Sequence, residues 1–127
     1  METGAISDEQ INASSEWNAG NSASLGRLHL QAKEGKPGAW AAGTKDENQW
    51  LQIDLIGQYR VTRVATQGRE DYNQWVTQYQ LQYSNDSFKF EDYKEHGQEA
   101  TKVKYDVLNF SFEEKDASYL EVPFITT

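Results

Sequence analysis

Cysteine is absent from this chain of 127 residues, so it has no disulfide framework, no thiolate chemistry and no cysteine-ligated zinc. Basic residues are also scarce, with 12 Lys and Arg against 20 Asp and Glu, which gives a formal net charge of −8. Nucleic-acid binding needs clustered Lys and Arg, so this balance argues against a nucleic-acid partner and disfavours an anionic membrane surface. Cationic ligands, neutral sugars and Ca²⁺ stay open.

Long apolar stretches are missing as well. No run approaches the length of a transmembrane span, and the opening Met1 to Gly4 is neither basic nor apolar, so we expect no signal peptide in this sequence. If the protein is secreted, the chain is then a mature fragment or a domain. Large side chains are present instead: four Trp, seven Tyr and five Phe supply the core of one domain over residues 1–127.

Apolar and polar residues alternate along much of the chain. Tyr79, Leu81 and Tyr83 alternate with three Gln, which predicts a half-buried antiparallel strand. Similar alternation marks residues 50–55, 103–107 and 119–122, and Phe88 and Phe90 follow the turn-like residues 84–87, which suggests a hairpin. The intervening segments are rich in Gly, Asn, Asp and Ser, and no stretch has a helical stripe. The pattern predicts an all-β sandwich or barrel.

Several strings, in order between residues 4 and 83, resemble the discoidin (F5/8 C-type) domain family. They are residues 4–11 and 13–15, Gly26 to Leu28, Gly38 to Trp40, the strand Gln49 to Leu55, residues 64–69 and residues 75–79. Each string alone is weak, but together they are specific. The resemblance implies a discoidin-type β-sandwich, which is a distorted jelly-roll barrel, and a non-catalytic extracellular module that binds its ligand through loops at one end.

The resemblance weakens after about residue 95. Residues 117–122 keep the family's aromatic and aliphatic positions, but Ser118 and Glu121 stand where arginines are common, and the family's usual disulfide is impossible without cysteine. Two alternatives therefore stay open for the C-terminal closure of the sandwich: the final family strand is lacking, or it is supplied elsewhere. An absent strand would leave an unpaired edge and favour self-association.

The resemblance implies that the ligand is held by residues 17–24, 33–38 and 69–74. Trp17 either stacks on a sugar ring or packs back on the barrel, and Arg69 either binds sugar hydroxyls or pairs with its acidic neighbours. We expect the other three tryptophans, Trp40, Trp50 and Trp75, to lie in the core. The candidate ligand-binding residues are Trp17, Asn18, Asn21, Lys36, Arg69, Asp71, Tyr72 and Gln74.

Ca²⁺, lipid and collagen are the alternative ligands for these loops. Asp46 and Glu47 carry oxygen ligands suited to Ca²⁺, the one cofactor left open, although acidic loops are usually only solvated. Lipid insertion is disfavoured because the loop tips are polar and only Trp17 and Tyr72 could enter a bilayer. Collagen-reading discoidin domains share the loop Trp and Arg, but their acidic partners are replaced here, by Pro37 and Gln74.

Catalysis finds no support in the sequence. His29 and His96 lie far apart, and there is no nucleophile elbow, zincin His pair, phosphate loop or dinucleotide fingerprint. We predict a non-enzymatic module for cell adhesion or matrix attachment that binds a glycan or glycoprotein. The rival interpretation is an acidic structural matrix component that binds Ca²⁺ or mineral without a defined site.

Overall fold

The computed structural model describes residues 5–69, 72, 74–76, 78–95, 98–99, 102–103 and 108–126, and these form strands and short 3₁₀ turns without an α-helix. The strands are β1 (Ile11–Ala13), β2 (Trp50–Thr66), β3 (Gln78–Tyr79), β4 (Gln82–Ser84), β5 (Glu91–Asp92), β6 (Lys94–Glu95), β7 (Gln98–Glu99), β8 (Lys102–Val103) and β9 (Leu108–Thr126). The 3₁₀ turns are η1 (Asp8–Gln10), η2 (Ala19–Asn21) and η3 (Ala23–Leu25). This composition confirms the all-β prediction. No helix in this part of the chain is long and apolar enough to span a membrane.

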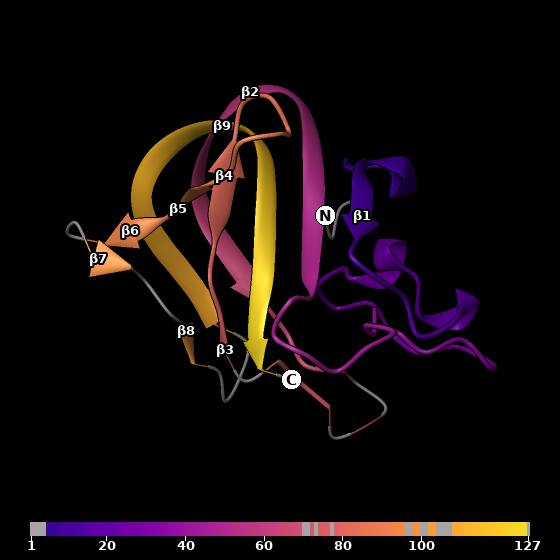
Figure 1. The fold of residues 1–127 in the computed structure, drawn as a ribbon. Helices are drawn as coiled ribbons and strands as arrows, with labels where there is room; N and C mark the ends of the chain where they lie inside the picture. Colours follow the sequence, from indigo (N-terminus) through magenta and orange to yellow (C-terminus); the bar gives the residue numbers. More distant parts are fainter. Residues whose placement is uncertain are drawn as a thin grey trace.

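Two long antiparallel strands, β2 and β9, form the frame of the molecule. Their pairing runs from Trp50 opposite Pro123 to Thr66 opposite Leu108, and Figure 1 shows both strands arching over the same end. The arch in β2 is made at Ile56 and Gly57, which have φ angles of 47° and 128°, and the pairing register shifts there. Such an irregularity bends a strand sharply. Because β2 turns back on itself, its first and last residues lie at the same end of the fold.

The shorter strands are added to this frame. β1 pairs with the first part of β2, with Ile11 opposite Ile53, while β4 and β3 pair with the last part of β9. β5 extends the sheet beyond β4, β8 extends it beyond β3, and β6 and β7 form a separate hairpin. The sheet order along the main path is β1-β2-β9-β3-β8.

The expected strand over residues 78–83 is divided in two. Gln78 and Tyr79 belong to β3, Gln82 and Tyr83 belong to β4, and between them the Leu81 carbonyl accepts a hydrogen bond from the Tyr93 amide at 2.7 Å. The inward positions are confirmed for Tyr79 and Leu81, which are buried, whereas Tyr83 is half-buried and donates its hydroxyl to Glu91.

The core is built around Tyr79, Leu81 and Tyr93, with Trp40, Leu51 and Val76 among the partly buried residues that pack against it. Trp40 and Trp50 are half-buried, but Trp75 is 49% exposed, so the prediction that Trp75 lies in the core is wrong. The expected hairpin after Tyr83 is present, because β4 pairs with β5. Tyr105 and Val107 lie outside the described residues.

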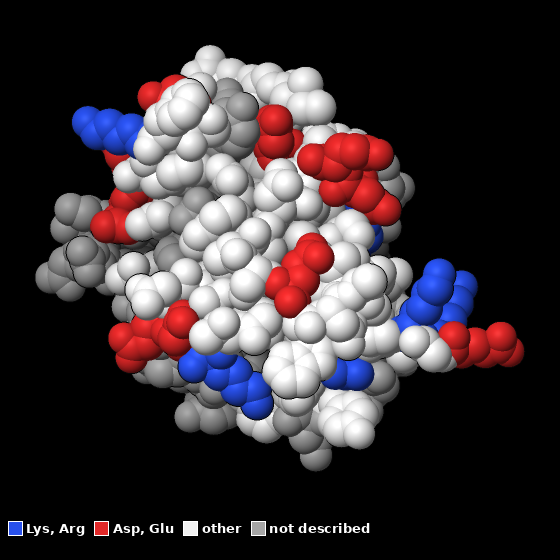
Figure 2. Space-filling view, turned by 45° about the vertical axis from the view of Figure 1, so that its right-hand side comes forward, with Lys and Arg blue, Asp and Glu red and all other residues white. Residues whose placement is uncertain are grey.

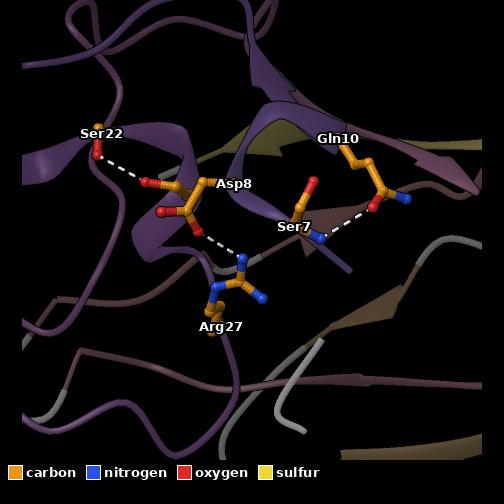
Figure 3. A network of polar contacts seen from close by, with 6 residues as sticks. Ser7, Asp8, Gln10, Ser22 and Arg27 are labelled. Atoms are coloured by element: carbon orange, nitrogen blue, oxygen red, sulfur yellow. Dashed lines mark hydrogen bonds and ion pairs between the residues drawn. The ribbon is translucent and has the colours of Figure 1, made fainter. Parts of the chain in front are cut away.

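A polar network fixes the segment before β1 (Figure 3). The Ser7 amide donates to Gln10 Oε1 at 2.9 Å, and Arg27 donates to Asp8 Oδ1 at 2.6 Å, so η1 is tied to the chain that follows η3. Gln10 Nε2 also donates to the Asp54 carbonyl at 2.7 Å, close to the arch of β2. These bonds give Arg27 a structural role, because they tie η1 to the segment just after η3.

Candidate ligand-binding loops

The segments on either side of β2 gather at one end of the molecule (Figure 1), because the arch returns Thr66 to the level of Trp50. We call residues 14–24 the Trp17 loop and residues 67–76 the Arg69 loop. Residues 30–43 run between them and contact the Trp17 loop. His29, just before this segment, donates its amide to Gln67 Oε1 of the Arg69 loop at 2.7 Å.

The Trp17 loop presents its tryptophan to solvent on a braced backbone. The Trp17 side chain is 63% exposed, while its amide donates to the Ala41 carbonyl at 2.8 Å. Glu16 Oε1 accepts a hydrogen bond from the Ala23 amide at 2.7 Å, which closes the loop on itself. Asn18 is exposed beside Trp17. The loop therefore offers a fixed aromatic face with a polar neighbour.

Asn21 lies inside this loop, away from solvent. Its side chain is buried, its Nδ2 donates to the Ala39 carbonyl at 3.0 Å, and its own carbonyl accepts from the Ala41 amide at 3.3 Å. A buried amide that satisfies a neighbouring backbone group stabilises the structure. Asn21 thus joins residues 14–24 to residues 30–43 through a buried side chain, and its role as a ligand-binding residue stays a prediction.

Lys36 lies on a tight turn at the other side of the Trp17 loop. The turn is closed by two backbone bonds between Lys33 and Lys36, and Gly35 takes a φ of 75° that favours glycine. Lys36 is exposed, and the neighbouring Pro37 packs near Gly20, because a Cβ on Gly20 would lie 3.6 Å from Pro37 Cδ. The turn is therefore joined to the Trp17 loop through Pro37 and Gly20.

The Arg69 loop is organised by bonds among its own residues. The Arg69 amide donates to the Gln74 carbonyl at 2.9 Å, and its Nη1 donates to Gln74 Oε1 at 3.0 Å. The guanidinium carbon lies 4.8 Å from the centre of the Tyr72 ring, within the range of a cation–π contact. Tyr72 is 65% exposed. The acidic neighbours of Arg69, Glu70 and Asp71, lie outside the described residues.

Trp75 belongs to this loop, although its sequence pattern predicted a core position. It lies opposite Gly68, where a Cβ would come within 3.2 Å of the Trp75 Cβ and 3.4 Å of the Gln74 carbonyl. The small residue at position 68 therefore allows the two sides of the loop to approach. The Arg69 loop therefore carries two exposed aromatic side chains, Tyr72 and Trp75, together with the half-buried Arg69.

The acidic stretch, residues 45–48, is held in place by hydrogen bonds to Asp46. Asp46 Oδ1 accepts from Gln49 Nε2 and from the Asn48 amide, each at 2.8 Å, and these bonds lower the pKa of Asp46. Glu47 is exposed. Within the described residues there is no group of three or more His, Cys, Asp or Glu that could hold a metal ion. Figure 2 shows acidic side chains in several separate groups over the visible face, with basic groups near some of them.

Comparison with known proteins gives consistent matches. Residues 10–126 match the family model of the F5/8 type C domain. Human EGF-like repeat and discoidin I-like domain-containing protein 3 is 39% identical over 108 residues, which are 81% of this chain and 22% of the relative. The chain therefore spans about a fifth of that relative.

Two solved structures share the fold. Wild-type discoidin II of Dictyostelium discoideum superposes with a TM-score of 0.80 at 21% identity, over 91% of this chain and 48% of that one. CpGH89CBM32-5 of Clostridium perfringens, in complex with GalNAc-β-1,3-galactose, gives a TM-score of 0.70 at 18% identity over 94% of this chain and 87% of that one.

Proposed function

The chain belongs to the F5/8 type C (discoidin) domain family, and we propose that it is an extracellular module that reversibly binds a glycan or glycoprotein. Domains of this family are generally non-catalytic binding modules. The observation that carries the proposal is the pair of exposed aromatic groups at one end of the fold. Trp17 lies on one braced loop, and Tyr72 and Trp75 lie on another.

The chemistry of these groups suits a sugar. An exposed tryptophan has a broad apolar face that can cover the C–H face of a pyranose ring, and an arginine can donate two parallel hydrogen bonds to adjacent oxygens. Asn18, Lys36 and Gln74 add polar groups, and Asp71 stays in the proposed set as a prediction. A structure that shares this fold is known in complex with a GalNAc-containing disaccharide, which supports the choice of ligand class.

A glycan array probed with the purified domain tests this proposal, once with Ca²⁺ and once with a chelator. We expect a narrow set of related sugars, lost in Trp17→Ala and retained in Phe88→Ala. Phe88 is a matched control because it is an exposed aromatic, 91% exposed, on the turn between β4 and β5. A blank array with folded protein would overturn the glycan proposal and favour collagen or lipid as the ligand.

The rival proposal is an acidic matrix component, supported by the net charge of −8. Binding of Ca²⁺ or mineral by diffuse charge would weaken with added salt and would be the same in Trp17→Ala as in the wild type. A defined site would lose most of its binding in that variant. Binding by one small site is weak, so we place the module in a larger protein or an oligomer, where multivalency raises the avidity.

A further inference from the structure

Gln49 is a buried polar side chain, 6% exposed, at the position just before β2. Its Oε1 accepts hydrogen bonds from the hydroxyls of Ser14, at 2.8 Å, and Ser15, at 2.5 Å. Its Nε2 donates to Asp46 Oδ1 at 2.8 Å. We call these four residues the Gln49 cluster. One amide thereby joins the Trp17 loop to the acidic stretch.

The two ends of the Gln49 amide cannot be exchanged. The Ser14 hydroxyl accepts from the Trp50 amide, and the Ser15 hydroxyl accepts from the Gly43 amide, each at 2.9 Å, so both can turn their protons toward Gln49. For Ser14 the Gln49 acceptor, at 2.8 Å, is closer than the Trp50 carbonyl, at 3.4 Å. Asp46, as a carboxylate, can only accept. The cluster therefore requires an acceptor that faces the serines and a donor that faces Asp46, and glutamine supplies both.

The cluster reaches Trp17 through Ser15, two residues earlier in the chain. The Ser15 carbonyl accepts from Trp40 Nε1 at 2.9 Å, and its hydroxyl is held by both Gln49 and Gly43. The next residue, Glu16, is packed against Gly43, where a Cβ would lie 2.8 Å from the Glu16 carbonyl oxygen. The backbone that leads into Trp17 is thus fixed on several sides.

We propose that Gln49 is a positioning residue for the ligand-binding Trp17, acting through Ser15 and anchored on Asp46. The inference rests on the proposed function only for its effect on binding; the effect on Trp17 itself can be observed without a ligand. Gln49 does not touch the ligand. Its buried amide makes the orientation of the exposed tryptophan depend on a carboxylate in another segment.

The variant Gln49→Glu tests the donor end of the cluster. A carboxylate at position 49 still accepts the two serine hydroxyls, but at neutral pH it faces Asp46 with the same charge and without a proton. Burial and the neighbouring carboxylate both raise the pKa of such a group, so acidification restores a proton between the two acids. The other charged groups nearby are Lys45 and Glu47, which flank Asp46, and Glu16, whose Oε1 is occupied by the Ala23 amide.

A ligand-free readout comes first. With 5-fluorotryptophan in all four positions, the ¹⁹F resonance of Trp17 is assigned by its loss in Trp17→Phe. We expect this resonance to shift or broaden in Gln49→Glu at pH 7 and to return toward the wild-type position at low pH. In the double variant Asp46→Asn, Gln49→Glu, donor and acceptor are exchanged, although the NH₂ group now at position 46 gives up the bond that Asp46 Oδ1 accepts from the Asn48 amide. We therefore expect the resonance to return toward the wild-type position at pH 7.

Gln82→Glu is the matched control, because Gln82 Nε2 donates to Asp92 Oδ1 at 2.7 Å in the β4–β5 pair. It makes the same change in the same kind of pair, away from the loops, and should leave the Trp17 resonance unchanged. The proposal is overturned if Gln49→Glu leaves that resonance unchanged at every pH, or if Gln82→Glu moves it equally.

Binding is measured second, on immobilised GalNAc-β-1,3-galactose. We expect the Kd to rise roughly three- to tenfold in Gln49→Glu at pH 7, with recovery at low pH relative to the wild type and in the double variant. If the wild type does not bind any glycan, the proposed function fails while the ¹⁹F result still decides the role of Gln49. A normal Kd beside a displaced Trp17 resonance would overturn the link to binding.

Discussion

The two ligand-binding loops are held in different ways. The Trp17 loop depends on residues far away in the sequence: Ala39, Ala41, Gly43 and Gln49 all bind its backbone or side chains. The Arg69 loop is held mainly by Arg69, Tyr72 and Gln74, which lie within five residues of each other, and the His29 amide adds one distant bond to Gln67. A loop held from a distance fails when the surrounding fold is disturbed, whereas a locally closed loop changes only when its own residues change. Variants in the first loop should therefore lower stability and binding together, and variants in the second should lower binding alone.

The largest effect is expected from Gly38→Ala. Gly38 lies next to residues 39–43, which form hydrogen bonds to the Trp17 loop. A Cβ at this buried position would lie 2.5 Å from the Leu30 carbonyl oxygen and 2.8 Å from the Ala32 nitrogen, and backbone atoms cannot move aside cheaply. We expect the free energy of unfolding in urea to fall by about 3 kcal/mol, the upper end of overpacking costs. Gly35→Ala is the control, with nothing within 4 Å of its Cβ but a φ of 75°, and should cost about 1 kcal/mol. Equal losses would contradict the steric argument.

Asn21→Ala should have the next largest effect. It leaves the Ala39 carbonyl without its partner and removes the bridge between two segments, so we expect the free energy of unfolding to fall by about 1–2 kcal/mol. Asn18→Ala, at an exposed position three residues earlier, should change it by less than about 0.5 kcal/mol. If Asn21→Ala weakened glycan binding without loss of stability, Asn21 would belong to the ligand site after all.

Arg69→Lys tests the Arg69 loop separately from the Trp17 loop. Lysine keeps the charge but loses the planar group that bonds to Gln74 and lies over the Tyr72 ring. We expect a change in unfolding free energy below about 0.5 kcal/mol, since its partners Tyr72 and Gln74 are both exposed. Affinity for GalNAc-β-1,3-galactose, measured by calorimetry, should fall about tenfold through lost charge-assisted hydrogen bonds. A large stability loss would show that the Arg69 loop is not locally closed.

The smallest effect concerns acid pH at Asp46. Hydrogen bonds from Gln49 and Asn48 lower its pKa below the ordinary 3.8, so the folded state holds this proton less tightly than the unfolded state. The stability that ionised Asp46 contributes to the fold is fully present above the ordinary pKa, and it is lost as the pH falls through the lowered pKa of the folded state. The Asn48 amide shift should titrate with a midpoint below 3.8. If the Asn48 amide shift no longer changes with pH in Asp46→Asn, the titration belongs to Asp46. A midpoint above 3.8 would contradict the hydrogen-bonded geometry.

Alternation in the sequence was enough to predict the strand at Trp50 and the burial of Tyr79 and Leu81, because each depends on a local period of two. The arch at Ile56 was not foreseen, since only Gly57 hints at an irregularity within an otherwise regular strand. The split between β3 and β4 depends on a bond from Tyr93, twelve residues after Leu81, and leaves no local trace.

The site residues divide in the same way. Trp17 and Tyr72 could be chosen from the sequence because large aromatics in polar loops stand out, and the structure places both in solvent. Asn21 could not be recognised as a brace, because its partner is 18 residues away. The sequence pattern predicts Trp75 as a core residue. In the structure it lies opposite Gly68 and is exposed on the Arg69 loop, an approach that has no local signal in the sequence. Gln49 lies in the most family-like string, but its role depends on serines more than thirty residues earlier.

The pairing of β2 with β9 has a consequence for biosynthesis. β2 begins at Trp50, and its partner β9 begins only at Leu108. More than half of the described chain must therefore leave the ribosome before the main ladder can close. Until then, the unpaired edge of β2 is open to other nascent chains, and contacts so distant in sequence form slowly. The same arch that gathers the loops at one end thus delays the closure of the main ladder during translation until β9 has been made.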